Sequence, residues 1–306
     1  MLEMQTMTHE ESVKRHQTQL RNQKISLVIR MILTYLFLVV FALYIIIPFY
    51  WMVNVSLQTN AQAISANPVY FPDKWVFHNY VKVMTEYQLG RYMINTVAVG
   101  AVSTAIGTVL TIFMAFALSR LQFRGKDALF SVLLATMMIP GEMMVLTNYL
   151  TVSKFGWIAG TGEGFSLTPY LSMTVPFFVS VFNVYQLRQA FKIIPNELYY
   201  AAKVDGTSDW KYLWRVMVPQ AKSTITMIII LKLMASWNSY AWPNLVAEGD
   251  YRLITNGLRE AFSSGDDRNP ELQMAATIIV TLPLLIVFMI FRKSIMKGVS
   301  RSGIKG

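Results

Sequence analysis

The sequence contains no cysteine and only three histidines, His9, His16 and His78, among its 306 residues. Without cysteine the chain forms no disulfide and has no thiol chemistry. The histidines are scattered along the chain in a spacing that does not fit a zinc site. Charged residues are also scarce, at 14% of the sequence, compared with about 25% in ordinary soluble domains. These shortages exclude a disulfide scaffold and disfavour a soluble globular domain.

Catalytic motifs are missing as well. The sequence has no GxSxG, no HExxH, no Walker lysine loop and no paired carboxylates with a basic partner. The Asp266-Asp267 doublet has glycine and serine neighbours, which is more typical of a solvated turn than of a metal site. We therefore expect no catalytic residue, no metal site and no enzymatic activity on this chain. Any energy source is expected to come from another chain.

Long apolar runs dominate what is present, since 54% of the residues are hydrophobic. A bilayer crossing takes about 20 residues, and six runs are long enough: 27–53, 91–118, 128–150, 168–188, 223–242 and 273–291. The first run is too long for a signal-peptide core and lacks a small-residue cleavage site, so we expect it to be retained. The predicted fold class is therefore an all-α polytopic membrane protein with six transmembrane helices.

The distribution of basic residues predicts the orientation of these spans. Nineteen of the 27 lysines and arginines belong to the N-terminal tail, the 120–126 and 188–222 loops and the C-terminal tail, whereas seven belong to the outer loops. Cytoplasmic segments are enriched in lysine and arginine. Both termini and the segment 194–219 are thus expected in the cytoplasm, and the net charge of +10 indicates topology rather than nucleic-acid binding.

The cytoplasmic segment 194–219 reads IPNELYYAAKVDGTSDWKYLWRVMVP and predicts two short helices hinged at Gly206. The first begins at Pro195-Asn196, and Thr207 or Ser208 is expected to cap the second. The second helix carries an apolar stripe at i, i+3, i+4 and i+7, made of Trp210, Leu213, Trp214 and Met217. A polar loop with such a stripe is expected to dock into a partner.

Two ionisable residues, Glu142 and Lys232, lie within the predicted spans, where isolated charges are costly. Their axial offset is about 7 Å at 1.5 Å per residue, so an ion pair is one hypothesis. The alternative, which we favour, places Glu142 near the outer interface and lets Lys232 snorkel. Helix-interrupting residues recur in the later spans, and together they favour a translocation path over simple packing irregularity: Pro140, Gly141, Pro176, Pro243 and Pro283.

Several motifs resemble one known family. The residues Ile194-Pro195, Glu197-Leu198, Ala201-Ala202, Asp205-Gly206 and Pro219 resemble the EAA loop of ABC importer permeases. Further motifs resemble the carbohydrate-uptake branch: Ala117-Leu118-Ser119-Arg120 with Phe123-Arg124-Gly125, Trp237-Asn238 with Trp242-Pro243, Met274-Ala275-Ala276 with Leu282-Pro283, and Lys297-Gly298 with the final Gly303-Ile304-Lys305-Gly306. The resemblance covers residues 30 to 306 and is greatest to the second permease subunit of maltose and glycerol-phosphate type systems.

This resemblance implies a type I ABC importer permease fold in the cell membrane. It divides the chain into a cytoplasmic tail (1–26), a first helix and outer loop (27–90), the permease domain (91–291) with its coupling loop 194–219, and a cytoplasmic tail (292–306). The implied partners are a second homologous permease, two ATPase subunits, an extracytoplasmic solute-binding protein and membrane lipid, but no nucleic acid. No cofactor is expected on this chain, because the partner ATPase binds ATP and Mg²⁺.

The resemblance also implies residue roles. Contacts that couple the chain to the ATPase are expected from Glu197, Ala201, Ala202, Asp205, Gly206, Trp210, Leu213 and Trp214. Candidates for the translocation path, each equally open to a packing role, are Glu142, Asn148, Lys232, Trp237, Asn238 and Trp242. Two positions depart from the family: Tyr200 replaces its glutamate, which predicts a more aromatic docking surface, and Ser223 replaces a proline, which predicts a continuous helix into the fifth span.

The implied function is ATP-driven uptake of a sugar, oligosaccharide or polyol derivative. The alternatives are an ABC permease for another solute such as glycerol phosphate, an ATP-independent carrier or channel, and a membrane-embedded enzyme. A carrier is expected to contain a complete substrate path, often with paired halves. Six spans without an internal repeat disfavour a carrier, and the lack of converging reactive groups disfavours an enzyme.

Overall fold

The computed structural model describes residues 9–158, 166–263 and 269–300, and within these ranges the chain is helical without any β-strand. The all-α prediction is confirmed for the described residues. The four longest helices are α1 (His9–Ser56), α4 (Leu89–Ser119), α12 (Lys222–Trp237) and α15 (Pro270–Ser300). Each contains most or all of one apolar run that the sequence predicts to be a span.

The number of spans that the described residues support is smaller than six. Three helices are long and apolar enough to cross a membrane, and the number reaches five if each of two bent helix pairs forms one span. One pair joins Lys126–Thr136 to Gly141–Lys154 with a bend of 92°, and the other joins Asp209–Gln220 to Lys222–Trp237 with a bend of 79°. The predicted span 168–188 does not appear as one continuous helix.

Proline explains two of these interruptions, because it lacks the backbone N–H and clashes with the preceding turn. Pro140 separates α5 from the 3₁₀ turn that begins at Gly141, and Pro176 lies inside the 3₁₀ turn that separates α7 from α8. In contrast, α15 continues past Pro283. The elements around the two breaks are α5 (Lys126–Thr136), η1 (Gly141–Met144), α6 (Val145–Lys154), α7 (Thr168–Thr174), η2 (Val175–Phe177) and α8 (Val181–Ile193).

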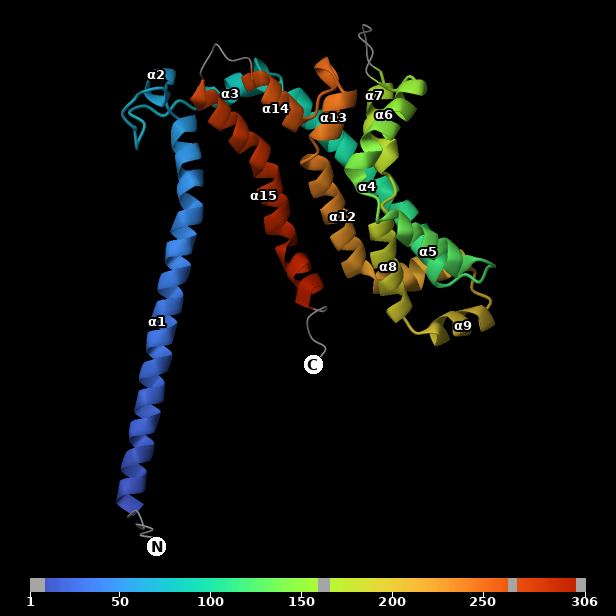
Figure 1. Cartoon of the computed structure of the whole chain (residues 1–306), viewed down its shortest axis with the longest axis horizontal. Coiled ribbons are helices and arrows are strands. Elements are labelled where there is room, and N and C mark those ends of the chain that lie inside the picture. The colour runs from blue at the N-terminus through green and yellow to red at the C-terminus, as the bar shows by residue number, and fades with distance from the viewer. Residues whose placement is uncertain (1–8, 159–165, 264–268, 301–306) are drawn as a thin grey trace.

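Helix α1 stands apart from the other helices and meets them near its C-terminal end, where it contacts α15 (Figure 1). None of its apolar span is buried within the chain. Short elements gather at the upper edge of this view, namely α2 (Asn60–Ala63), α3 (His78–Thr85), α13 (Ala241–Val246), η4 (Gly249–Tyr251) and α14 (Ile254–Ser263). The start of α1, the end of α15 and α9 (Asn196–Val204) lie toward the lower edge.

Helix α4 forms the centre of the bundle and packs along both α8 and α12. The contact is close at Gly107, where a Cβ atom would lie 2.3 Å from the Phe178 carbonyl oxygen and 2.6 Å from Lys232 Nζ. Because no real Cβ atom tolerates such distances, this crossing needs glycine. The close approach brings α4, α12 and the break before α8 together.

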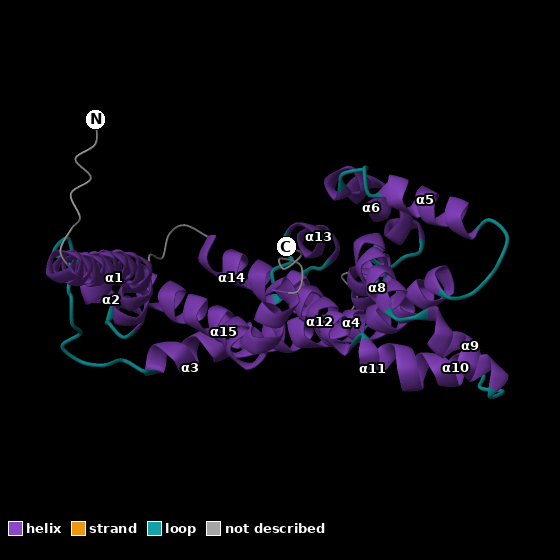
Figure 2. Ribbon diagram, turned by 90° about the horizontal axis from the view of Figure 1, so that it is seen from below, coloured by secondary structure: helices purple, strands orange, loops and turns teal. Residues whose placement is uncertain are grey.

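The lower end of the bundle is held by a hydrophobic cluster from α4, α8, α12 and the elements between α9 and α12. These elements are α10 (Asp209–Tyr212), the π-helix η3 (Leu213–Met217) and α11 (Val218–Gln220). Figure 2 shows α9 and α10 at the opposite edge of the molecule from α1. The cluster therefore fixes the 194–219 segment to the central helices.

Candidate functional site

The 194–219 segment folds as the two helical pieces that the sequence predicts. Helix α9 ends at Val204, and Gly206 just beyond it has a φ of +68°, the left-handed conformation that glycine favours. The Gly206 amide donates to the Lys203 carbonyl at 3.1 Å and the Thr207 amide to the Ala202 carbonyl at 2.8 Å, which is the Schellman pattern. Ser208, rather than Thr207, caps α10, because its hydroxyl accepts a hydrogen bond from the Lys211 amide.

Arg120, at the end of α4, ties this segment to the bundle. Its side chain is buried, and its guanidinium donates to the Phe191 carbonyl at 2.6 Å, to the Ile194 carbonyl and to the Asn196 side chain. These acceptors are the last carbonyls of α8 and the first residue of α9. A cation is favoured at a helix C-terminus, so Arg120 both caps α8 and fixes where α9 begins.

Arg188 makes the reciprocal contact from α8 to α4. Its Nε donates to the Leu118 carbonyl at 3.0 Å, in the last turn of α4. Its guanidinium carbon also lies 3.6 Å from the centroid of the Phe130 ring on α5. Helices α4 and α8 therefore each receive an arginine from the other at the end next to the 194–219 segment.

A second set of contacts locks α9 against α10. The Asp209 carboxylate accepts a hydrogen bond from Tyr199 Oη at 2.8 Å and pairs with Lys203 Nζ at 2.7 Å. This bond to Asp209 raises the pKa of the Lys203 ammonium, while burial raises the pKa of the Tyr199 hydroxyl. The Tyr199 and Tyr212 rings meet edge to face at 5.1 Å. The two pieces thus form one unit on the end of α4 and α8.

Most of the apolar stripe packs inward on the chain's own core, while its docking into a partner stays a prediction. Leu213 and Met217 are buried in the chain's own core and Trp214 is half-buried. Only Trp210 remains exposed, and its ring packs on Phe113 of α4 at 5.7 Å. A π-helix runs through Leu213–Met217, and the core covers that face. Leu213 therefore supports the segment from inside the chain's own core.

The exposed surface of the segment is instead the outer face of α9. We define this α9 face by its exposed residues, Glu197, Leu198, Tyr200, Ala201, Val204 and Asp205. The side chain of Val204 is 89% exposed and that of Tyr200 58%. Ala202 is half-buried against the core. Val204 escaped the sequence analysis, although its i, i+4 spacing from Tyr200 indicates a second apolar face.

The junction into α12 is bent, so the prediction of a continuous helix at Ser223 is wrong. The helices on either side of Ala221 meet at 79°. Ala221 itself leaves the helical region with φ of −93° and ψ of 11°. The bend orients α12 along α4 while α10 to α11 stay on the end of the bundle.

Several of the proposed path residues make hydrogen bonds within the chain. Trp242 is buried, and its Nε1 donates to the Ser172 carbonyl at 3.0 Å; Trp237 Nε1 donates to the Val280 carbonyl of α15 at 3.1 Å. Asn238 donates to the Met234 carbonyl within the turn that ends α12. On the other side of the Pro140 break, Glu142 is exposed on η1 and Asn148 is half-buried on α6. The structure thus gives three of these residues hydrogen bonds within the chain, and two of the bonds join different elements.

The hypothesised ion pair between Glu142 and Lys232 does not form within the described ranges. Lys232 Nζ donates instead to the carbonyls of Phe177 and Phe178, at 3.3 and 3.1 Å. These carbonyls are freed by the Pro176 break, and Gly107 leaves room for the lysine beside them. Neither the ion-pair hypothesis nor the snorkelling alternative predicts these carbonyls as the partners of Lys232. The contact depends on packing between segments that are far apart in the sequence.

We expect the Glu142→Gln and Lys232→Met substitutions to have additive effects on solute uptake and on the melting temperature. Lys232→Met leaves two carbonyls unpaired, which costs roughly 1–3 kcal/mol, whereas Glu142→Gln changes an exposed group. A double-mutant cycle measures the coupling. A coupling free energy near 3 kcal/mol, as for a broken buried pair, would contradict the assignment of Lys232 to the broken helix.

Among the described residues no cluster of three or more histidine, cysteine or carboxylate side chains is arranged to hold a metal ion. Asp266-Asp267 lies outside the described residues. The candidate site is the exposed α9 face, at the end of α4 and α8 where the two arginines lie.

Comparison with known proteins shows similarity along almost the whole chain. The "Probable ABC transporter permease protein MG189 homolog" of Mycoplasma pneumoniae is 30% identical over 275 residues, covering 85% of this chain and 83% of that protein. The "Diacetylchitobiose uptake system permease protein NgcG" of Streptomyces coelicolor is 27% identical over 267 residues, covering 86% and 85%.

A solved structure shares the fold. It is the crystal structure of a bacterial ABC transporter involved in the import of the acidic polysaccharide alginate; one of its chains matches with a TM-score of 0.77 at 20% identity. The match covers 88% of this chain and 97% of that chain. Residues 19–301 also match the family described as binding-protein-dependent transport system inner membrane component. The chain therefore belongs to the family of binding-protein-dependent transport system inner membrane components, the permeases of ABC transporters.

Proposed function

We propose that this chain is the transmembrane permease subunit of an ATP-driven importer that moves a carbohydrate across the cell membrane. The observation that carries this proposal is the α9 face, an exposed and partly apolar surface on a segment that is otherwise built into the core. The name of the diacetylchitobiose relative supports a carbohydrate substrate. Six membrane crossings and the regions 1–26, 27–90, 91–291 and 292–306 remain part of the proposal.

The proposed orientation places both termini and α9 in the cytoplasm. It is supported by the basic residues of the N-terminal and C-terminal tails and by the position of α9 toward the same edge as the start of α1 (Figure 1). The proposed assembly contains a second permease, two ATPases that bind ATP and Mg²⁺, and an external solute-binding protein. This chain itself acts in transport and not as an enzyme.

The α9 face is proposed to seat in a groove of the ATPase. Its apolar members, Leu198, Tyr200 and Val204, contribute buried area, and Glu197 and Asp205 lie at its ends. Ala201 keeps the centre of the face flat. Trp210 remains exposed on the neighbouring helix α10 and is proposed to add a rim contact. Ala202, Gly206, Leu213 and Trp214 act indirectly, by positioning this face.

The test is Val204→Asp in the assembled transporter. A charge placed on a docked apolar surface is expected to weaken ATPase binding by about 2 kcal/mol or more, as at other interface hot spots. Copurification of the ATPase and ATP hydrolysis stimulated by the binding protein should both be lost. Val204→Thr has the same shape without the charge and serves as the matched control, with much smaller losses.

Substrate class is tested separately with the cognate binding protein. Sugars and oligosaccharides are expected to stimulate uptake and ATP hydrolysis, whereas glycerol phosphate and amino acids are not. Stimulation by glycerol phosphate alone would replace the carbohydrate proposal by the phosphate alternative. Uptake that persists when the ATPase is absent would replace it by the carrier alternative.

A further inference from the structure

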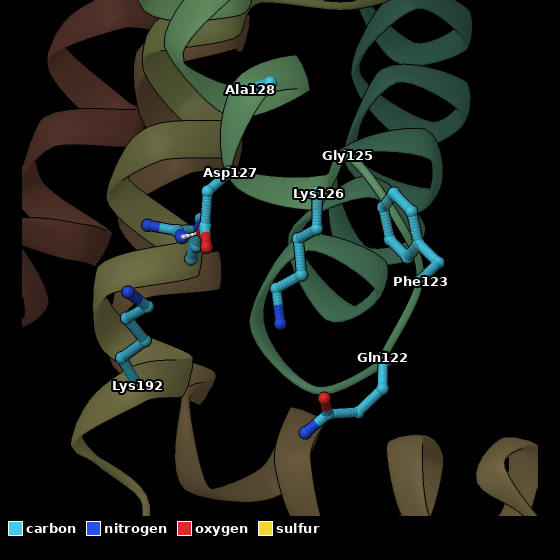
Figure 3. A pocket seen from close by; sticks show the side chains of 8 residues that line it. Gln122, Phe123, Gly125, Lys126, Asp127, Ala128 and Lys192 are labelled. Atoms are coloured by element: carbon cyan, nitrogen blue, oxygen red, sulfur yellow. Dashed lines mark ion pairs between the residues drawn. The ribbon is translucent and has the colours of Figure 1, made fainter.

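A polar pocket of about 470 Å³ lies beside the α4–α5 loop, the first turn of α5 and the C-terminal half of α8. Lys126, from the start of α5, and Lys192, from α8, flank its opening, and Asp127 lies between them in this view (Figure 3). Arg188 and Gly125 complete its wall. None of these residues belongs to the α9 face, so the pocket is a second feature of the cytoplasmic end.

The pocket has a surplus of positive charge. Three cationic side chains line it, against the single carboxylate of Asp127. That carboxylate is 92% exposed. Its Oδ1 atom lies 3.8 Å from Arg188 Nη2, which is a long distance for an ion pair. Lys192 is exposed, and within the described residues no hydrogen bond or ion pair engages its ammonium. An anion that enters the pocket therefore meets positive charge that the Asp127 carboxylate does not neutralise.

Two of these cations are held in place before any ligand arrives. Lys126 Nζ donates to the Leu121 carbonyl at 3.0 Å, and Arg188 Nε donates to the Leu118 carbonyl at 3.0 Å. Both carbonyls belong to the end of α4 and the loop after it. Because hydrogen bonds to backbone carbonyls already hold these two side chains, binding an anion costs little additional side-chain entropy.

Exposed apolar side chains follow the pocket-lining residues along α5. Leu129 and Val132, three residues apart on that helix, are 48% and 61% exposed, and Phe123 at the pocket's rim is 43% exposed. Three-residue spacing places Leu129 and Val132 on one face. A free anion would fill the polar pocket alone, whereas a lipid would place its headgroup in the pocket and its acyl chains along this face.

We propose that this pocket binds the phosphate of an anionic phospholipid in the cytoplasmic leaflet. The inference rests on the proposed orientation of the chain, since basic pockets between helices on the cytoplasmic side suit lipid headgroups. A bound headgroup bridges Lys126 and Lys192, and so ties α5 to the helix that leads into α9. The lipid thereby stiffens the support of the α9 face.

The test uses the assembled transporter in nanodiscs of phosphatidylcholine with increasing phosphatidylglycerol, and native mass spectrometry to count retained lipid. Lys192→Gln is expected to weaken phosphatidylglycerol retention roughly fivefold, because one basic residue near the surface contributes about that factor. Lys222→Gln removes an exposed lysine at the start of α12, outside the pocket. This matched control should retain lipid like the unaltered protein.

Three outcomes would overturn the proposal. Equal retention by Lys192→Gln and Lys222→Gln would mean that the pocket holds no lipid. Displacement of phosphatidylglycerol by inorganic phosphate at equal concentration would identify a free anion as the ligand. Loss of ATPase copurification by Lys192→Gln in pure phosphatidylcholine would identify a protein contact. Lipid retention does not require transport, so this test can fail while the transport function stands.

Discussion

Replacing Arg120 with methionine is expected to abolish uptake and to lower the free energy of unfolding by roughly 2–6 kcal/mol. The guanidinium is buried and serves two backbone carbonyls and the Asn196 side chain. Methionine fills much of the volume but leaves the Phe191 and Ile194 carbonyls without this donor, at about 1–3 kcal/mol for each buried acceptor. The start of α9 then loses its fixed position relative to α4.

Two further variants separate position from charge. Arg124→Met removes an exposed arginine four residues along the same loop, and it should leave uptake and the melting temperature almost unchanged. Arg120→Lys keeps the charge but cannot span three acceptors with a planar fork, so we expect partial uptake. Limited proteolysis between α8 and α9 provides the structural readout. If Arg120→Met resists proteolysis and transports normally, Arg120 does not position the segment.

Local features of the sequence predict much of this arrangement. The apolar runs predict α1, α4, α12 and α15 because a helix that crosses a bilayer needs a long stretch of consecutive apolar residues. Pro140 predicts the break before η1, since proline acts on its own turn. Gly206 and Ser208 predict the end of one helix and the start of the next for the same reason. Each of these elements depends on neighbours within a few residues.

The contacts that position the site depend on residues far apart in sequence. Arg120 meets Asn196 and Lys232 meets Phe178, and no periodicity in either segment indicates the partner. The apolar stripe that contains Leu213 also shows that tertiary packing cannot be predicted from local sequence. Its apolar spacing predicts a buried face correctly, but whether the chain's own core or another protein covers that face is decided by tertiary packing.

Replacing Gly206 with proline is expected to abolish transport while membrane insertion stays intact. Gly206 has φ of +68° and donates its amide to the Lys203 carbonyl. Proline fixes φ near −65° and has no N–H, so it can satisfy neither the left-handed turn nor the Schellman bond. The turn lies outside the long apolar helices, hence insertion should not require it. Radiolabelled solute uptake by vesicles measures transport, and carbonate extraction measures insertion.

The matched variants isolate the backbone requirement. Space around Gly206 is open, because a Cβ atom at this position would meet nothing within 4 Å. A side chain by itself is therefore tolerated. Gly206→Asn should retain most uptake because asparagine accepts the left-handed region. Gly206→Ala should fall between the two, at a conformational cost of about 1–2 kcal/mol. Uptake should thus decrease from Gly206→Asn to Gly206→Ala to Gly206→Pro, which is the order in which these residues accept a positive φ. Equal loss in all three would point to a lost contact at this surface, and normal uptake in Gly206→Pro would show that coupling does not need this turn.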